Sequence, residues 1–171
     1  VGSYLQNWPK EHIIKCLVQY HPDDTPMNRL DQETQIKTLY EAAQASGHEL
    51  LLEIIPTRKL PQKPDTVYRA MKRMYNLGIY PEWWKLEQMD SDEQWNAVDA
   101  LIQERDPYCR GVVLLGLSAP VETLVKGFSA AKVSKTVRGF AVGRTIFFEP
   151  SRQWLAGELD DRGVIDACKA T

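Results

Sequence analysis

The sequence has few cysteines and histidines, and neither residue type forms a recognisable motif. The cysteines are odd in number, widely spaced and free of any CxxC pair: Cys16, Cys109 and Cys168. This pattern predicts neither a disulfide framework nor a zinc site, and Cys16 lies in an apolar run typical of a small core residue. The histidines are equally scattered: His12, His21 and His48. They do not make a convincing ligand set, so we expect no metal site.

The chain also lacks a long hydrophobic run and an excess of positive charge. Its apolar stretches are only a few residues long, whereas a membrane span needs about 20. The first residues lack the basic start and apolar region of a signal peptide. A net charge of −2 argues against a nucleic-acid surface. We therefore expect a cytoplasmic protein with neither membrane nor nucleic-acid partners, in a reducing setting. The start at Val1, without methionine, fits a fragment, a processed form or an engineered start.

What is present is a regular alternation of strand and helix patterns over 171 residues, the size of one domain. Apolar, β-compatible runs predict strands at residues 13–20, 50–55, 83–87, 111–116 and 137–142. Helical patterns occupy residues 29–46, 65–77, 92–105 and 121–131, and return from 151 to 155 and beyond. This order predicts one α/β domain over residues 1–171, with a parallel sheet and right-handed crossovers.

Helix boundaries are marked by a few punctuating residues. Gly47 and Gly78 are well placed to end the first two helices. Asp65 and Ser91 are expected to cap the helices that follow them, and Pro150 to precede the last one.

Three strands carry a charged residue where an apolar one would be ordinary. Alternation along each strand places Lys15, Glu53 and Lys85 on faces that converge if all look into one barrel. A buried ammonium is costly, and low dielectric lowers its pKa and favours the nucleophilic amine. Two structural alternatives remain open: Lys15 with its head in solvent at a sheet edge, and an ion pair of Lys85 with Glu53 or Glu87.

Two strand ends carry glycine beside a polar residue. Gly143 and Arg144 follow the fifth strand, where backbone N–H groups and a forked cation suit a phosphate. Gly116 and Ser118 follow the fourth strand; the alternative there is an ordinary turn before the helix that starts near Pro120. In parallel α/β folds, functional groups collect at such carboxyl ends of strands.

Together these strand motifs resemble class I Schiff-base aldolases built on the (β/α)8 TIM barrel, such as the tagatose- and fructose-bisphosphate aldolases. The matching segments are Ile14-Lys15-Cys16, Leu52-Glu53-Ile54, Trp84-Lys85-Leu86, Leu115-Gly116-Leu117-Ser118 and Gly139-Phe-Ala-Val-Gly143-Arg144. In those families a lysine stands on the fourth strand, a glutamate on the fifth and the imine-forming lysine on the sixth. The resemblance implies that this chain forms about strands 4–8 of such a barrel with their helices.

A narrower likeness is to the aldolase-like domain (DUF2090) fused behind 5-dehydro-2-deoxygluconokinase in bacterial myo-inositol catabolism. It is carried by residues 20–24, 49–56, 112–117 and 139–147 and extends over essentially the whole chain. It implies cleavage of 2-deoxy-5-keto-gluconate 6-phosphate to dihydroxyacetone phosphate and malonate semialdehyde, without a cofactor. It also implies a sugar kinase domain fused at the N-terminal side.

The resemblance also implies roles for individual residues. Lys85 would form the imine, Glu53 would shuttle protons, and Lys15 would help to lower the pKa of Lys85 together with partial burial beside Trp83. Gly143 and Arg144 would hold the phosphate, helped by Gly116 and Ser118. The following residues could contact sugar hydroxyls, or form a turn that caps the next helix: His21, Asp23 and Asp24.

The sequence departs from the aldolase pattern in two respects. The turn after the fourth strand reads Leu-Gly-Leu-Ser rather than the Ser-rich turn of the better-known aldolases. Five strands also cannot close an eight-stranded barrel, so we expect an exposed sheet edge and an apolar interior face, covered by a larger protein or by a second copy. The alternative function is a non-catalytic phosphosugar-binding or regulatory module attached to the kinase.

Overall fold

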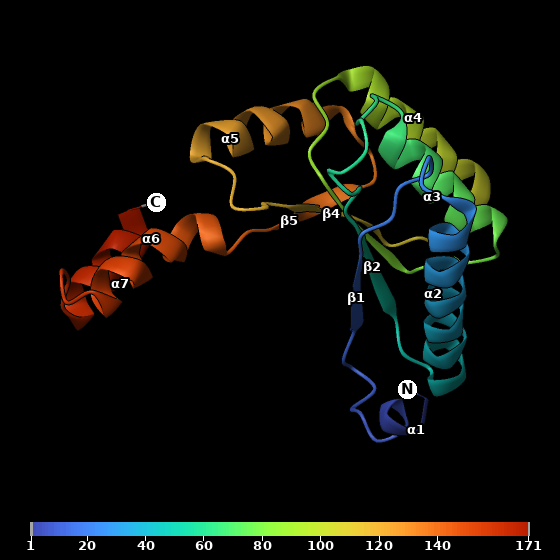
Figure 1. The fold of residues 1–171 in the computed structure, drawn as a ribbon, viewed down its shortest axis with the longest axis horizontal. Coiled ribbons are helices and arrows are strands. Elements are labelled where there is room, and N and C mark those ends of the chain that lie inside the picture. Colours follow the sequence, from blue (N-terminus) through green and yellow to red (C-terminus); the bar gives the residue numbers. More distant parts are fainter. Residues whose placement is uncertain (1, 171) are drawn as a thin grey trace.

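The protein is built on a five-stranded sheet in which all neighbouring strands are parallel (Figure 1). The computed structural model describes residues 2–170. The strands are β1 (Ile14–Val18), β2 (Leu50–Ile54), β3 (Trp83–Leu86), β4 (Gly111–Leu115) and β5 (Val137–Ala141). They lie side by side in the order β1-β2-β3-β4-β5, so sequence neighbours are also neighbours in the sheet. The predicted α/β class with a parallel sheet is confirmed.

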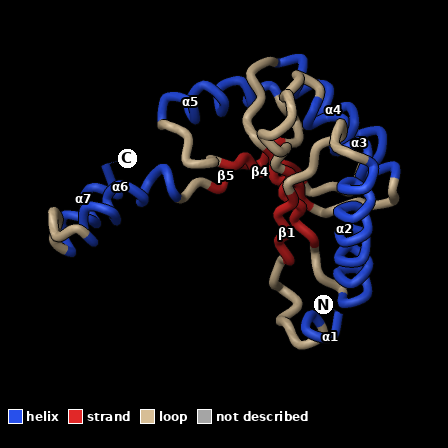
Figure 2. Tube along the Cα trace, viewed as in Figure 1, coloured by secondary structure: helices blue, strands red, loops and turns tan. Residues whose placement is uncertain are grey.

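Helices alternate with the strands and cover one face of the sheet (Figure 2). The helices are α1 (Gly2–Leu5), α2 (Pro26–Ser46), α3 (Thr66–Asn76), α4 (Asp92–Arg105), α5 (Val121–Ala130), the 3-10 turn η1 (Ala131–Val133), α6 (Arg144–Leu155) and α7 (Asp161–Ala170). Helices α2 to α5 all lie on the same side of the sheet, whereas α6 and α7 pack against each other beyond β5 (Figure 1).

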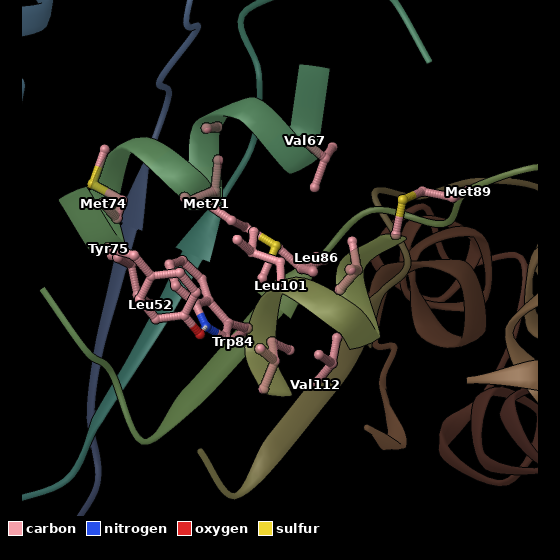
Figure 3. Packing of buried hydrophobic residues seen from close by; sticks show 14 of the residues in the cluster. Leu52, Val67, Met71, Met74, Tyr75, Trp84, Leu86, Met89, Leu101 and Val112 are labelled. Carbon is pink, nitrogen blue, oxygen red and sulfur yellow. Dashed lines mark hydrogen bonds between the residues drawn. The ribbon is translucent and has the colours of Figure 1, made fainter. Parts of the chain in front are cut away.

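The core lies between the sheet and this helical layer (Figure 3). Alternate residues of the central strands point into it, including Leu52, Trp84 and Val112, and α3 supplies Met71 and Tyr75. The indole N–H of Trp84 donates a hydrogen bond of 2.8 Å to the Tyr75 hydroxyl, so this buried polar pair is satisfied. Each large apolar side chain in the layer contributes about 1.5–3 kcal/mol through burial. These contacts fix the sheet beneath the helices and therefore also fix the direction of its other face.

That other face, the open face, carries no helix in the part of the chain that the structure describes. It is formed by Lys15, Leu17, Leu51, Glu53, Trp83, Lys85, Val113 and Leu115. The Leu17 side chain on this face is 46% exposed, because β1 is an edge strand and no helix of residues 2–170 covers this face. The expected exposed sheet edge is confirmed at β1 and β5 for residues 2–170. The uncovered face is not wholly apolar, because Lys15, Glu53 and Lys85 stand on it.

Most of the predicted helix boundaries are confirmed. Gly47 and Gly78 adopt φ values of 70° and 71° after α2 and α3, a left-handed conformation that glycine adopts without a steric cost. The Ser91 hydroxyl accepts a bond from the Gln94 N–H and caps α4. Asp65 does precede α3, but its side chain makes no capping hydrogen bond.

The last predicted helix begins earlier than the sequence indicated. We placed its start after Pro150, whereas α6 begins at Arg144 and carries Pro150 in its interior. Proline removes one intrahelical bond, which usually ends a helix. Here the helix continues through Pro150, which is its buried residue. Gly143, one residue before Arg144, is therefore the real start signal.

Candidate functional site

The open face brings together the three charged residues predicted from strand alternation. Glu53 on β2 stands directly opposite Lys85 on β3 in the register, and Lys15 reaches the same carboxylate from β1. The Lys15 Nζ lies 2.6 Å from Glu53 Oε2. The Lys85 Nζ lies 3.3 Å from each of the two Glu53 oxygens. One carboxylate therefore bridges two ammonium groups.

Burial differs sharply among the three side chains. The Glu53 side chain is only 5% exposed, that of Lys85 17% and that of Lys15 47%. A buried carboxylate is costly without a cation, so the two lysines account for its position. The nearly buried pair is Glu53 and Lys85, while Lys15 supplies a second positive charge from the solvent side.

A cavity of about 250 Å³ lies beside this cluster at the carboxyl ends of the strands. Glu53 and Lys85 form one side of it. The loops after β4 and β5 form the other side, with all four residues predicted for a phosphate: Gly116, Ser118, Gly143 and Arg144. Apolar side chains complete the lining: Leu17, Ile55, Leu115, Leu117, Ala141 and Phe147. Segments more than 50 residues apart in sequence thus share one small space.

The loop after β5 points the start of a helix at the cavity. Gly143 is the N-cap of α6, and Arg144 is its first residue. First-turn N–H groups lack partners inside a helix, and the helix dipole adds positive potential there. Among residues 2–170, no carboxylate pairs with Arg144, so its exposed guanidinium adds an uncompensated charge. Such an end is suited to an anion.

The loop after β4 has an unusual backbone. Leu117 and Ser118 have φ values of 49° and 60°, which residues with a side chain seldom adopt. The turn is closed by a bond of 2.9 Å from the Ala119 N–H to the Gly116 carbonyl oxygen. Its strained conformation is held from outside, since the Thr145 hydroxyl donates a 2.9 Å bond to the Ala119 carbonyl.

Sequence reasoning missed two lining residues on α6. Thr145 joins the two loops, and the Phe147 ring packs on Gly143, where an added Cβ would approach its Cε1 to 2.9 Å. Predicting a helix that starts at Arg144 would have placed both of them in its first turn, next to Gly143.

The predicted hydroxyl-contacting residues lie outside this cavity and have partners of their own. The buried His21 ring accepts the Asp23 N–H and lies 3.2 Å from the Pro61 carbonyl oxygen. Asp23 pairs with Lys63 and Arg69. Asp24 accepts the Thr25 N–H and the Asn28 side-chain amide at the start of α2.

Strand β1 ends at Val18, so its alternation does not extend to His21. The side chain of His21 consequently does not share the open face with Lys15. The geometry matches the turn alternative for His21, Asp23 and Asp24.

A second buried carboxylate, Glu87, comes directly after β3, two residues beyond Lys85. Arg58 clamps it through one guanidinium nitrogen at 2.8 and 2.9 Å. Burial raises the pKa of Glu87 above its ordinary value, and Arg58 opposes that shift. Glu87 pairs with Arg58 rather than with Lys85, so the competing ion pair considered from sequence is formed by Glu53 alone.

The architecture is thus an α/β fold in which a lysine–carboxylate cluster on the sheet lies beside two loops suited to bind an anion. The chain belongs to a family described as an uncharacterized protein conserved in bacteria (DUF2090), whose model matches residues 1–171. Membership confirms the DUF2090 assignment made from the sequence motifs. A search of curated proteins found no match.

Two negative observations apply to residues 2–170. No helix among them is both long enough and apolar enough to cross a membrane. No group of three or more His, Cys, Asp or Glu side chains in this range is arranged to hold a metal ion.

Proposed function

We propose that this chain is the carboxyl-terminal part of a class I aldolase of the TIM-barrel type, with Lys85 as the imine-forming residue. The observation that carries the proposal is the single cavity shared by Lys85, Glu53 and Arg144. The proposed substrate is 2-deoxy-5-keto-gluconate 6-phosphate, as the resemblance to the kinase-fused aldolase-like domain implies. The five strands would correspond to strands 4–8 of the barrel.

The first chemical step would be the attack of the Lys85 amine on the substrate ketone. The ammonium has to lose a proton first, and Glu53, 3.3 Å away, is positioned to receive it. Lys15, 2.6 Å from Glu53, pairs with the same carboxylate from β1 and holds it on the open face beside Lys85. Glu53 would then give that proton to the carbinolamine hydroxyl, which leaves as water, so that the protonated imine forms and Glu53 is again a carboxylate.

The second step would break the bond between carbons 3 and 4 of the substrate. Glu53 would take the proton from the hydroxyl on carbon 3, and the bonding electrons would pass into the imine to form an enamine. Malonate semialdehyde would leave as the aldehyde product. Protonation of the enamine and hydrolysis would release dihydroxyacetone phosphate and restore the Lys85 amine.

The phosphate would lie against the loops that follow β4 and β5. Arg144 and the first N–H groups of α6 supply positive charge, and Gly143 brings the backbone close. Holding the phosphate there fixes the ketone over Lys85, so that attack becomes effectively intramolecular.

Borohydride trapping tests this proposal directly. Incubation with the keto-acid phosphate or with dihydroxyacetone phosphate, followed by sodium borohydride, is expected to leave a secondary amine on Lys85. Intact-mass measurement and peptide mapping would detect the adduct and locate it. The Lys85→Met variant is expected to lose the adduct while keeping the far-ultraviolet circular dichroism of the parent.

Lys126→Met provides a matched control, because it exchanges an exposed lysine of α5 for the same residue. It should trap as the parent does. An adduct that maps to any residue other than Lys85 would contradict the proposal, as would no adduct in protein that binds dihydroxyacetone phosphate.

One observation favours the non-catalytic alternative, a phosphosugar-binding module. Lys85 and Glu53 form an ion pair, which a purely structural role would also require. Such a module would keep Arg144 but would not need an amine nucleophile. Dihydroxyacetone phosphate binding that is unchanged in Lys85→Met, together with no trapping in the parent, would identify it.

A further inference from the structure

A second cavity, of about 230 Å³, lies between α2, α3 and the turn after β1. It shares no residue with the candidate site on the open face. Four of its seven lining residues are cationic: Arg29, Arg69, Lys72 and Arg73. Tyr20, Pro22 and Asn76 complete it, so no acidic side chain lines the space.

Two carboxylates outside the cavity lining pair with two of these cations. Glu33 accepts two bonds from Arg73, at 2.9 and 2.7 Å, and a third from the Tyr20 hydroxyl at 2.7 Å. Asp23 pairs with Arg69 and, at 2.9 Å, with Lys63. Two of the lining guanidinium groups, those of Arg69 and Arg73, are therefore held in place by carboxylates that do not line the cavity.

The remaining two lining cations have no carboxylate partner within residues 2–170. Lys72 lies over the Tyr68 ring at 5.7 Å, and no ion pair engages Arg29. The positive charges at the cavity are the four lining cations and Lys63, which makes five. The negative charges are Glu33, Asp23 and Asp65, which lies near Arg69, and these make three. The cavity thus keeps a surplus of two positive charges.

Arg29 also has an unsatisfied hydrogen-bond donor. Its Nε is buried and has no hydrogen-bond partner among the described residues. A buried donor on a charged group that stays unpaired costs about 1–3 kcal/mol or more. The Arg29 side chain lines the cavity, so a bound anion would supply the guanidinium with the charged partner that it lacks among the described residues.

We propose that this cavity binds a phosphate-sized oxyanion, either inorganic phosphate or the phosphate group of a small ester. Guanidinium forks match the oxygen geometry of phosphate, and three of the four cations are arginines. The volume lies below the range of about 300–1,000 Å³ typical of drug-sized ligands, so the site fits the charged group rather than a large molecule. The site is independent of the proposed aldolase chemistry.

Titration calorimetry at constant ionic strength tests the proposal, with inorganic phosphate and glycerol 3-phosphate as the two probes. The measurements use the Arg144→Gln chain, so that the candidate site on the open face does not contribute. We expect saturable binding of at least one probe to a single site. Adding Arg29→Gln and Lys72→Gln should weaken that binding at least tenfold. Tighter binding of glycerol 3-phosphate would indicate an ester, and tighter binding of phosphate the free ion.

The matched control adds Arg162→Gln and Lys126→Gln instead, which removes one arginine and one lysine from other surfaces. Binding should then remain within twofold of the Arg144→Gln parent. The proposal is overturned if Arg144→Gln alone abolishes binding, or if the two pairs of substitutions weaken it equally. Neither pair removes a carboxylate-paired arginine of the cavity, and thermal melting checks that the variants fold.

Discussion

At the scale of single residues, three buried glutamates are distinguished by their partners. Glu53 is shared by two lysines and faces the cavity, Glu87 is clamped by Arg58, and Glu33 is held by Arg73 and Tyr20. The Glu53–Lys85 pairing could be predicted, because strand alternation and neighbouring strands are readable from sequence. The Glu33–Arg73 pairing could not, since it joins two helices 40 residues apart whose relative rotation depends on packing.

The hydrogen bonds from Arg73 hold the pKa of Glu33 below its ordinary value of 4.5, against burial, which raises it. A carboxylate with a lowered pKa stabilises the folded state above its ordinary pKa and loses this effect as pH falls through the lowered value. The Glu33→Gln variant should therefore be less stable at pH 7 by about 1–2 kcal/mol. This value is lower than hydrogen bonds between fully buried charged groups would give, because Arg73 is partly exposed to water. The deficit should shrink below about pH 4. Urea unfolding at several pH values measures it.

Glu41→Gln on the same helix is the matched comparison. Glu41 is exposed and lies 3.9 Å from Lys37, so its loss should change stability by less than about 0.5 kcal/mol. Equal losses in the two variants, or a Glu33→Gln deficit that does not depend on pH, would show that the Arg73 pair does not stabilise the fold.

At the scale of elements, the boundaries that follow local chemistry were predictable and those that follow packing were not. Gly47, Gly78 and Ser91 mark helix ends through their own backbone or side chain. The start of α6 could not be found in this way, because Pro150, a strong local stop signal, lies inside the helix. The first predicted strand, residues 13–20, was also too long, because β1 ends at Val18 and the chain turns before His21.

Gly143 is tightly packed by the α6 residue Phe147, and this contact can be tested. Its φ of −136° is ordinary for any residue, but a Cβ would meet the Phe147 ring at 2.9 Å. In Gly143→Ala the ring must therefore swing, which alters the lining of the cavity. We expect a folded protein, destabilised by about 1 kcal/mol, with at least tenfold weaker calorimetric binding of dihydroxyacetone phosphate.

Gly139→Ala on β5 isolates this effect, since an added Cβ there meets nothing within 4 Å. It should bind as the parent does. Replacing Phe147 by leucine in the Gly143→Ala background should restore part of the affinity by making room. Equal binding by all three variants would show that this loop does not contact the ligand.

At the scale of the whole molecule, the sheet is open on one face and at both edges within residues 2–170. The edge strands β1 and β5 present unpaired backbone groups, and Leu17 exposes apolar surface beside them. The number and order of the strands could be predicted from alternating patterns, because each parallel connection returns the chain beside the preceding strand. A partner for the open face could not be predicted, because the sequence pattern of each strand shows which face is apolar or charged but not what packs on it.

We expect the isolated chain to self-associate through these surfaces. Light scattering at micromolar concentration should give a mass at least twice 19.6 kDa. Leu17→Lys, which places a charge on the open face at the β1 edge, should lower the measured mass. A parent mass of one chain at every concentration would show that the open face tolerates water.

The strand order β1-β2-β3-β4-β5 also affects how the chain can fold during synthesis. Each strand pairs only with the one made just before it and the one made just after it. The pairing partner of every strand after the first has therefore already left the ribosome when that strand emerges, and the separations to be bridged remain short. The sheet can grow from the amino-terminal side one βα unit at a time, with the newest strand as its growing edge.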